Sequence, residues 1–189
     1  MLSTIYHNIQ KQATTEAQSV ERLIPHFVRV TDVDNSPDLT DIHPRDREDM
    51  DLRFITIDDS LFPNTLKLIE QVPGINNALI IGIAPQSQLY THVDTIDLEP
   101  YEEIDWLSVY MGMFVPSLDQ SKLGVKVGDK IFNHKNTIIF DTQIPHSAWN
   151  WTDNWWVSVR LSVDKTMIST TDKYTHIITK ESKHESIDP

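Results

Sequence analysis

The chain has 189 residues and a formal net charge of −12, with 39% hydrophobic and 23% charged residues. This length fits one domain around one core, and the composition is typical of a globular protein and too apolar for a fully disordered chain. So acidic a chain repels phosphate backbones and anionic lipid, and it has no cluster of Lys and Arg, which disfavours nucleic acid and membranes as partners. It contains no cysteine, which excludes disulfides, thiolate metal sites and a cysteine nucleophile.

No apolar run approaches the roughly 20 residues that a membrane span requires. The first residues also lack the basic-then-apolar order of a signal peptide. We therefore expect a cytoplasmic protein. The expected partner is a small-molecule or peptide substrate.

The first part of the chain favours helices and loops. Apolar residues recur at near-helical spacing over residues 8–23, which predicts a helix. Residues 31–53 are rich in aspartate and contain two prolines, which predicts a long irregular loop, either solvated or acting as a lid. Residues 60–72 predict a second helix that begins at Ser60 or Asn64.

From residue 77 onward the sequence changes to short segments rich in β-forming residues. Turn signals separate them, among them Pro85, Pro116 and the Gly-Asp-Lys sequence at 128–130. At least six short strands within about ninety residues predict an antiparallel sandwich or barrel. The expected strands lie within residues 77–84, 87–93, 105–115, 122–128, 136–142, 146–151 and 155–164.

The segment LYTHVDTIDLEP places His92 and Asp94 on one face of an expected strand, because alternate side chains share a face. Their polar ends could therefore hold one ion. The best third ligand is His146, 54 positions after His92, at the start of another expected strand. Two imidazoles and one carboxylate form the facial triad of non-haem Fe(II) oxygenases, which leaves coordination positions for a bidentate cosubstrate and O₂.

Arg160 lies fourteen positions after His146, within an otherwise apolar and alternating segment. An unpaired buried guanidinium costs several kcal/mol, so Arg160 requires an anion, and a carboxylate is its natural partner. If Arg160 faces the metal, the distal carboxylate of 2-oxoglutarate would satisfy it. The alternative is a structural carboxylate such as Asp141.

Each of these residues has a bland alternative, since a lone histidine such as His146 is more often a hydrogen-bonded core residue. The order of the residues favours a metal site: His-x-Asp, a β-rich spacer, His, and then Arg on the following strand. Four tryptophans near this segment either pack the core or line a substrate wall: Trp149, Trp151, Trp155 and Trp156. The remaining histidines are expected at the surface: His7, His26, His43, His134, His176 and His184.

Residues 75–164 resemble the aspartyl/asparaginyl β-hydroxylase-like family of Fe(II)/2-oxoglutarate dioxygenases. The segment LSVYMGMFVP, residues 107–116, is similar to that family's strand after the first metal ligand. The segments LGVKVGDKIF and NTIIFDTQIPHSAWNWTD, within residues 123–153, are similar to its most recognisable block. There a short hairpin leads to Phe-Asp, the distal histidine, Trp-Asn and Thr-Asp.

The resemblance implies a mainly β fold, a double-stranded β-helix (jelly roll, cupin-like), with flanking N-terminal helices and Fe(II) at the mouth of the barrel. It implies His92 and His146 as iron ligands, Asp94 as the third, and 2-oxoglutarate and O₂ as cosubstrates. The presence of Asp94 favours hydroxylation over halogenation, because halogenases of this broad class leave that position for halide.

The sequence departs from the family's pattern near the cosubstrate. Family members carry a cosubstrate-binding arginine about ten residues after the distal histidine, where this chain has Trp156. Arg160 lies four residues further, roughly 13 Å along a strand. Either a bulge shifts the register, or the oxo acid binds differently, or Arg160 has another role; we assign the cosubstrate carboxylate to Arg160. Ser108 and Tyr110 stand where the name-giving members have Arg and His, so we expect another substrate. These two residues and Ser162 are candidates to hydrogen-bond the oxo acid or the substrate.

Taken together, these patterns predict one domain over residues 1–180, made of an N-terminal part, 1–74, and a jelly-roll core, 75–165, followed by a disordered tail, 181–189. The expected function is hydroxylation of a C–H bond of an amino acid, a small metabolite or a protein side chain. Two alternatives remain: a metal-binding jelly-roll enzyme that does not use 2-oxoglutarate, and a non-catalytic binding module.

Overall fold

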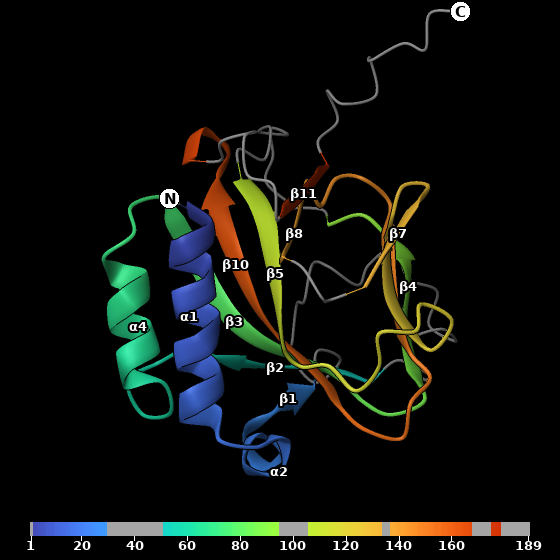
Figure 1. Ribbon diagram of the computed structural model, residues 1–189, viewed down its shortest axis with the longest axis horizontal. Helices are drawn as coiled ribbons and strands as arrows, with labels where there is room; N and C mark the ends of the chain where they lie inside the picture. Colours follow the sequence, from blue (N-terminus) through green and yellow to red (C-terminus); the bar gives the residue numbers. More distant parts are fainter. Residues whose placement is uncertain (1, 30–50, 95–105, 134–136, 168–174, 179–189) are drawn as a thin grey trace, which may run out of the picture.

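Two facing β-sheets form the body of the protein, and helices cover the outer face of the larger sheet (Figure 1). The computed structural model describes residues 2–29, 51–94, 106–133, 137–167 and 175–178. The mainly β jelly-roll fold with flanking N-terminal helices is confirmed.

The helical segments are α1 (Leu2–Ala17), α2 (Val20–Leu23), η1 (Ile24–His26), α4 (Pro63–Glu70) and η4 (Lys165–Met167). The strands are β1 (Val28–Arg29), β2 (Leu52–Thr56), β3 (Ile75–Ile83), β4 (Ser87–His92), β5 (Trp106–Phe114), β6 (Leu123–Val127), β7 (Lys130–Phe132), β8 (Thr137–Phe140), β9 (His146–Asn150), β10 (Trp156–Asp164) and β11 (Thr175–Ile178).

The larger sheet has the order β1-β2-β3-β10-β5-β8-β11, and the smaller has the order β4-β9-β6-β7. All neighbouring strands are antiparallel except β8 and β11, which are parallel. The segments predicted as strands from residue 77 onward therefore all form strands. None of the described helices combines the length and apolar character that crossing a bilayer requires.

Strand β10 separates two hydrophobic cores, because its side chains alternate between the faces of the larger sheet. Its residues Val157, Val159, Leu161 and Val163 pack with residues of α1 and α4. Trp156 points the other way and packs between the two sheets, with residues of β6, β8 and β9. The face that includes Trp156 and Arg160 is therefore the face directed toward the smaller sheet.

The N-terminal helix differs from the prediction of 8–23. It begins earlier, at Leu2, because Tyr6 already belongs to the apolar stripe that packs on the larger sheet. It also ends earlier, because Gln18 adopts a positive φ of 63°, which breaks the helix before Val20–Leu23 resumes it.

Helix α4 lies inside the predicted range of 60–72 and begins at Pro63. A carboxylate of the neighbouring helix caps its first turn. The Oε1 atom of Glu16 accepts hydrogen bonds from the backbone and side-chain amides of Asn64, and Oε2 accepts them from the backbone amide and hydroxyl of Thr65. A negative charge at a helix N-terminus is stabilising, so Glu16 joins α1 to α4.

Several short strands were not predicted. Residues 30–50, which hold most of the expected acidic loop, lie outside the described residues, but its last residues, Leu52 and Arg53, belong to β2. Lys130, expected in a turn, begins β7. Strands β1, β2, β7 and β11 are recognisable only through their pairing partners. The expected disordered tail also lies outside the described residues.

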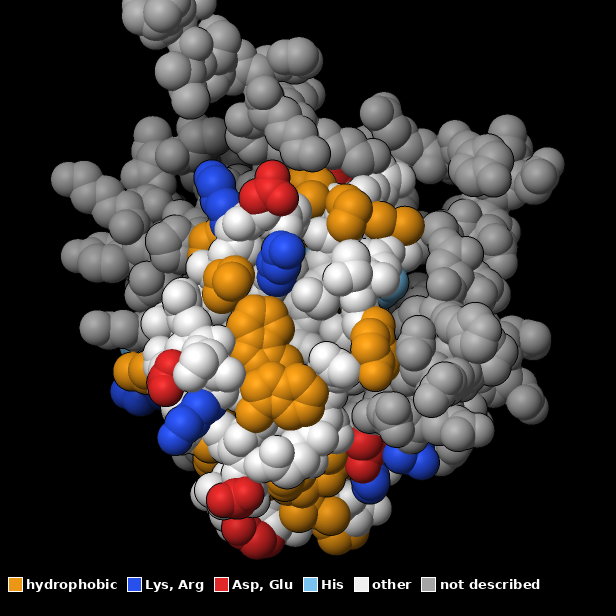
Figure 2. Space-filling view, turned by 90° about the vertical axis from the view of Figure 1, so that its right-hand side faces the viewer, with side chains coloured by type: hydrophobic (Ala, Val, Ile, Leu, Met, Phe, Trp, Pro, Cys, Tyr) orange, Lys and Arg blue, Asp and Glu red, His pale blue; other side chains and the backbone are white. Residues whose placement is uncertain are grey.

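The smaller sheet exposes part of its surface on the side turned toward the viewer in Figure 2, where hydrophobic side chains lie among charged ones. Three large hydrophobic side chains from or beside β6, β7 and β9 are exposed: Leu118, Ile131 and Trp151. Trp151 therefore belongs to the surface, and it neither packs in the core nor lines the cavity described below.

Candidate metal centre

His92 and His146 come from neighbouring antiparallel strands of the smaller sheet. His92 is the last residue of β4, His146 is the first of β9, and the two are direct cross-strand partners. Their ring centroids are 4.2 Å apart. Residues opposite each other in such a pair point to the same face, so the register alone brings the imidazoles together.

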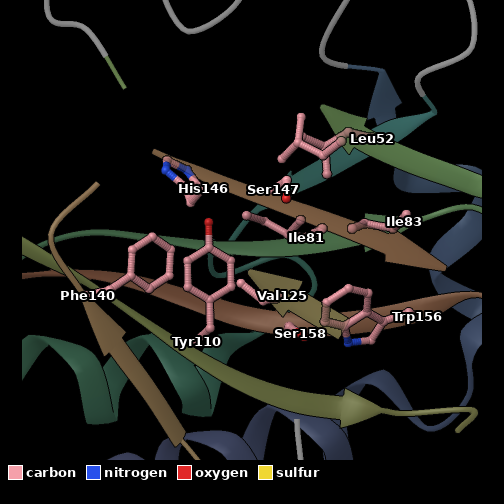
Figure 3. A pocket seen from close by; sticks show the side chains of 12 residues that line it. Leu52, Ile81, Ile83, Tyr110, Val125, Phe140, His146, Ser147, Trp156 and Ser158 are labelled. Atoms are coloured by element: carbon pink, nitrogen blue, oxygen red, sulfur yellow. The ribbon is translucent and has the colours of Figure 1, made fainter. Parts of the chain in front are cut away.

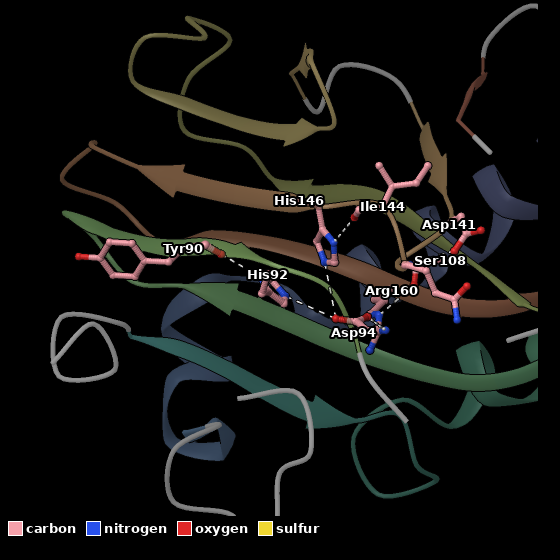
Figure 4. Close-up of polar contacts among 9 residues, drawn as sticks. Tyr90, His92, Asp94, Ser108, Asp141, Ile144, His146 and Arg160 are labelled. Carbon is pink, nitrogen blue, oxygen red and sulfur yellow. Dashed lines mark hydrogen bonds and ion pairs between the residues drawn. The ribbon is translucent and has the colours of Figure 1, made fainter. Parts of the chain in front are cut away.

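Each imidazole is oriented by a backbone carbonyl two residues earlier. His92 Nδ1 lies 2.8 Å from the carbonyl oxygen of Tyr90, and His146 Nδ1 lies 2.9 Å from that of Ile144 (Figure 4). A carbonyl oxygen only accepts, so each Nδ1 carries a proton, and each Nε2 is the nitrogen directed toward Asp94. Metal-binding histidines are commonly held in this way.

Asp94 completes the group, although it does not lie on the strand where it was predicted. β4 ends at His92, and the backbone amide of Asp94 donates to the carbonyl oxygen of Thr142 at 3.0 Å, in the turn that leads to β9. Its Oδ1 lies 3.4 Å from His92 Nε2 and 3.6 Å from His146 Nε2. A backbone contact with the neighbouring turn, and not strand alternation, therefore brings Asp94 to the histidines.

The three side chains fit a metal ion. One ligand atom from each of them lies within 4.8 Å of the others. Ligands about 2.0–2.2 Å from one ion, at adjacent octahedral positions, are about 3 Å apart, so the observed separations require only a small adjustment. Two histidines and one carboxylate on one side of an ion leave its other positions for exchangeable ligands.

The protonation states of the group also suit a metal. Burial alone would raise the pKa of the Asp94 carboxyl, but the contact with His92 and the charges of His146 and Arg160 outweigh it and lower the pKa to about 2. Burial, with the nearby His92, lowers the pKa of His146 to about 4. At neutral pH Asp94 is therefore a carboxylate and His146 is a neutral imidazole, which are the forms that bind metals.

Arg160 lies beside the same carboxylate. Its Nη2 donates to Asp94 Oδ2 at 3.2 Å, and its Nε donates to the buried hydroxyl of Ser108 at 3.3 Å. The proposed alternative partner, Asp141, instead lies 3.9 Å from the ammonium of Lys165. Because a guanidinium stays charged at any physiological pH, Arg160 is the permanent cation beside Asp94.

The other predicted cosubstrate residues lie on the same inward face of the larger sheet. Ser108 is paired with Ser162 across β5 and β10, and both are buried. Tyr110 is the cross-strand partner of Arg160, and its ring stacks on Phe140 at 5.4 Å. In Figure 3 the Tyr110 hydroxyl points toward the side on which His146 lies. The strand pairing therefore places Ser108, Tyr110 and Ser162 on the same face of the larger sheet as Arg160.

A cavity of about 40 Å³ adjoins His146 in the space between the two sheets (Figure 3). Apolar side chains from several strands form most of its walls, including Leu89, Val125 and Phe140. Trp156 and Ser158 of β10 also line it. The cavity was not predicted, because its walls come from segments that are distant in the sequence.

The comparisons with known proteins place the chain in a family. A family model described as aspartyl/asparaginyl beta-hydroxylase matches residues 53–180, which is more than half of the chain. The chain belongs to the aspartyl/asparaginyl beta-hydroxylase family. The predicted resemblance is thus confirmed, and the match begins before residue 75, at β2.

The ornithine lipid ester-linked acyl 2-hydroxylase of Rhizobium tropici is one relative of this chain. The two are 29% identical over 93 residues, which cover 48% of this chain and 30% of the relative. Among solved structures, the cupin domain of Schizosaccharomyces pombe Cnp3 gives a TM-score of 0.38 at 12% identity and covers 61% of this chain and 66% of that one. A predicted oxalate decarboxylase of Thermotoga maritima gives a TM-score of 0.37 at 9% identity, and the match covers 60% of this chain and 80% of that one.

Two residues near the end of β9, Trp149 and Asn150, make packing and hydrogen-bond contacts that join neighbouring strands and turns. Trp149 packs against Gly124, and its Nε1 donates to the carbonyl oxygen of Gln120 at 3.0 Å. The buried Asn150 donates through Nδ2 to the carbonyl oxygens of Ile83, Ala84 and Asn154. Asn150 therefore ties the turn between β9 and β10 to the end of β3.

The remaining aromatic and histidine predictions divide by position. Trp155 stacks on Phe27, with ring centroids 5.4 Å apart. Of the four tryptophans, only Trp156 lines the cavity. His7 and His26 are exposed, as predicted. Four other histidines fall outside the residues whose side chains are described: His43, His134, His176 and His184.

Proposed function

We propose that the chain is an Fe(II)-dependent oxygenase that uses a 2-oxo acid as cosubstrate and hydroxylates a C–H bond. The observation that supports this most directly is the convergence of His92, Asp94 and His146, with one ligand atom each, in a chain of a hydroxylase family. 2-Oxoglutarate is the 2-oxo acid that the sequence resemblance implies. Fe(II) held by these ligands would supply the redox chemistry of O₂ activation.

The overall reaction is balanced by the 2-oxo acid. One atom of O₂ enters the C–H bond as a hydroxyl group, and the other enters the carboxylate that remains when the 2-oxo acid loses CO₂. The protein contributes binding, orientation and exclusion of water. The carbonyl oxygens of Tyr90 and Ile144 orient the two imidazoles, and Arg160 offsets negative charge beside Asp94.

The substrate belongs to the proposal only as a class. Candidates are an amino acid, a small metabolite or a protein side chain, and the name of the Rhizobium relative adds an acyl group. The acidic net charge of −12 disfavours polyanionic substrates on electrostatic grounds.

The test measures metal-dependent decarboxylation. Metal-free protein is loaded with Fe(II) under nitrogen, mixed with one of several 2-oxo acids labelled at C1, and exposed to O₂; the release of labelled CO₂ is followed. We expect release that requires Fe(II) and O₂, that candidate substrates stimulate, and that His92→Ala abolishes. His7→Ala, at an exposed histidine, is the matched control and should behave as the unmodified protein.

Absence of Fe(II)-dependent release from every 2-oxo acid, with Fe(II) shown to be bound, would count against the proposal. The same protein would then fit a metal-binding jelly roll that uses no 2-oxo acid. Failure to bind Fe(II) at all would favour a non-catalytic binding module.

A further inference from the structure

We infer that the cavity beside His146 receives the tail of the 2-oxo acid, and that this site prefers a short, apolar tail to the charged tail of 2-oxoglutarate. The inference deepens the proposed function and rests on it, because it assumes that a 2-oxo acid binds next to the metal ligands. It concerns the cosubstrate and leaves the hydroxylated substrate open.

The cavity wall, in the part of the chain that the structure describes, carries no cation that could pair with the distal carboxylate of 2-oxoglutarate. Among the described residues that line the cavity there is no Lys or Arg. A carboxylate placed in such surroundings loses its hydration without gaining a cation, which weakens its binding. An apolar tail gains free energy in the same place.

Arg160 lies outside the cavity wall. It lies on the same strand and the same face as Trp156 and Ser158, but it contacts Asp94 and does not line the cavity. Strand geometry separates it from Trp156 by four residues, roughly 13 Å. Arg160 is thus placed beside the metal ligands, and Trp156 stands at the cavity where a cation for a distal carboxylate would be needed.

The volume of the cavity suits a short tail. A cavity of about 40 Å³ has room for roughly three water-sized groups, since one water requires about 10–15 Å³ on this measure. The isopropyl tail of 3-methyl-2-oxobutanoate has three carbon atoms. The tail of 2-oxoglutarate has five non-hydrogen atoms and one full charge.

The polar groups in the cavity wall must be weighed against a preference for an apolar tail. The Ser158 hydroxyl is buried and has no hydrogen-bond partner among the residues that the structure describes. A neutral hydroxyl could donate one hydrogen bond to a carboxylate. Tyr110, Ser147 and Trp156 also line the cavity and carry neutral donors. Neutral donors replace the hydration of a full charge less well than a cation does, so these groups favour a carboxylate less than the missing cation disfavours it.

The experiment compares three acids that share one head group. Fe(II)-loaded protein under nitrogen is titrated by calorimetry with pyruvate, 3-methyl-2-oxobutanoate and 2-oxoglutarate, so that the dissociation constants differ only through the tail. We expect 3-methyl-2-oxobutanoate to bind roughly tenfold more tightly than pyruvate, as two additional buried carbon atoms imply. We expect 2-oxoglutarate to bind more weakly than 3-methyl-2-oxobutanoate by a factor of ten or more.

Two variants locate the tail. Ala148→Leu narrows the cavity and should weaken 3-methyl-2-oxobutanoate while leaving pyruvate nearly unchanged. Trp156→Arg places a cation at the cavity and should reverse the preference toward 2-oxoglutarate. Ser158→Ala keeps the shape of the cavity and removes the hydroxyl, so its effect on the affinity for 2-oxoglutarate reports whether the hydroxyl contacts a carboxylate. Circular dichroism of each variant verifies folding, and the titrations of unmodified protein decide the question if a variant does not fold.

The outcomes separate the two proposals. Binding of 2-oxoglutarate as tight as, or tighter than, that of 3-methyl-2-oxobutanoate overturns the inference and leaves the proposed function intact. If 2-oxoglutarate binds at least as tightly as 3-methyl-2-oxobutanoate and Ser158→Ala weakens its binding, the distal carboxylate of 2-oxoglutarate lies in the cavity. If Fe(II) does not enhance the binding of any of the three acids, the proposed function fails, and this inference fails with it.

Discussion

Arg160 donates a hydrogen bond to Asp94 at 3.2 Å, although 66 positions separate the two residues in the sequence. Asp94 reaches this place through its backbone contact with Thr142, and Arg160 reaches it from the centre of β10. The same carboxylate therefore faces two imidazoles through Oδ1 and one guanidinium through Oδ2. This shared position links the stability of the fold to the proposed metal site.

Loss of the guanidinium should destabilise the metal-free protein. Arg160→Met leaves the Asp94 carboxylate largely buried without its guanidinium partner, so we expect the free energy of unfolding to fall by about 2–3 kcal/mol, somewhat less than for a fully buried pair. Urea denaturation of the metal-free variant and of the unmodified protein at pH 7 measures this change in the free energy of unfolding.

The double variant Asp94→Asn with Arg160→Met is the control for this pair. Because it removes both charges, part of the lost stability should return relative to Arg160→Met alone. Purely additive losses would show that the two charges do not interact in solution.

Removal of one proposed ligand should weaken metal binding strongly. We expect His92→Ala and Asp94→Ala each to reduce the affinity for Fe(II) by more than about 100-fold, since loss of a group that only orients a ligand already costs about 10–100-fold. Calorimetric titration under nitrogen measures the affinities. His7→Ala, on the exposed surface of α1, should keep the affinity of the unmodified chain, and an equal loss in this variant would argue for binding elsewhere.

The metal-free protein should lose stability as the pH falls from 6.5 to 4. The pKa of His146 is lowered from 6.5 to about 4 in the folded protein, chiefly by burial, so within this window the unfolded chain binds more protons. Stability therefore decreases toward acid, by about 3 kcal/mol over the whole window if His146 acts alone. Asp94, whose pKa is lowered from 3.8 to about 2, contributes a further loss only below pH 4.

Urea titrations at a series of pH values, with a chelator present, test this dependence. In His146→Gln the decrease between pH 6.5 and 4 should become distinctly shallower. An unchanged slope in that variant would mean that other groups bind the protons.

Gly124 should tolerate no side chain. An added Cβ would lie 2.7 Å from Cζ2 of Trp149, so Gly124→Ala forces the indole to move and endangers its hydrogen bond to Gln120. We expect a loss of about 1–3 kcal/mol, the usual cost of overpacking, measured by urea denaturation. Combining Gly124→Ala with Trp149→Leu should recover part of it, whereas a simple sum of both losses would exclude the proposed contact.

The sequence predicted the strands well where their signal is local. Alternating apolar residues marked β10, and turn residues separated its neighbours, so these elements could be placed without knowledge of their partners. Short strands such as β7 carry too few residues for a pattern. Their conformation depends on backbone hydrogen bonds to a neighbouring strand, which a sequence pattern does not contain.

The proposed ligands were predicted from residue types and spacing, yet the reason given for Asp94 was wrong. Strand alternation was expected to align Asp94 with His92, but β4 ends at His92 and the turn at Thr142 holds Asp94 in place. The pairing of His92 with His146 depends on the register between β4 and β9, including a bulge before His92.

By itself, the sequence determined a strand-rich second half and a set of two histidines and one carboxylate suited to a metal, because residue type and alternation are local properties. Only the tertiary structure decided that Arg160 meets Asp94 while Trp156 lines the cavity. Both side chains share one face of β10, and what each of them meets depends on how β10 lies between β3 and β5 and opposite the smaller sheet. That arrangement depends on contacts between distant segments, which composition and spacing do not reveal.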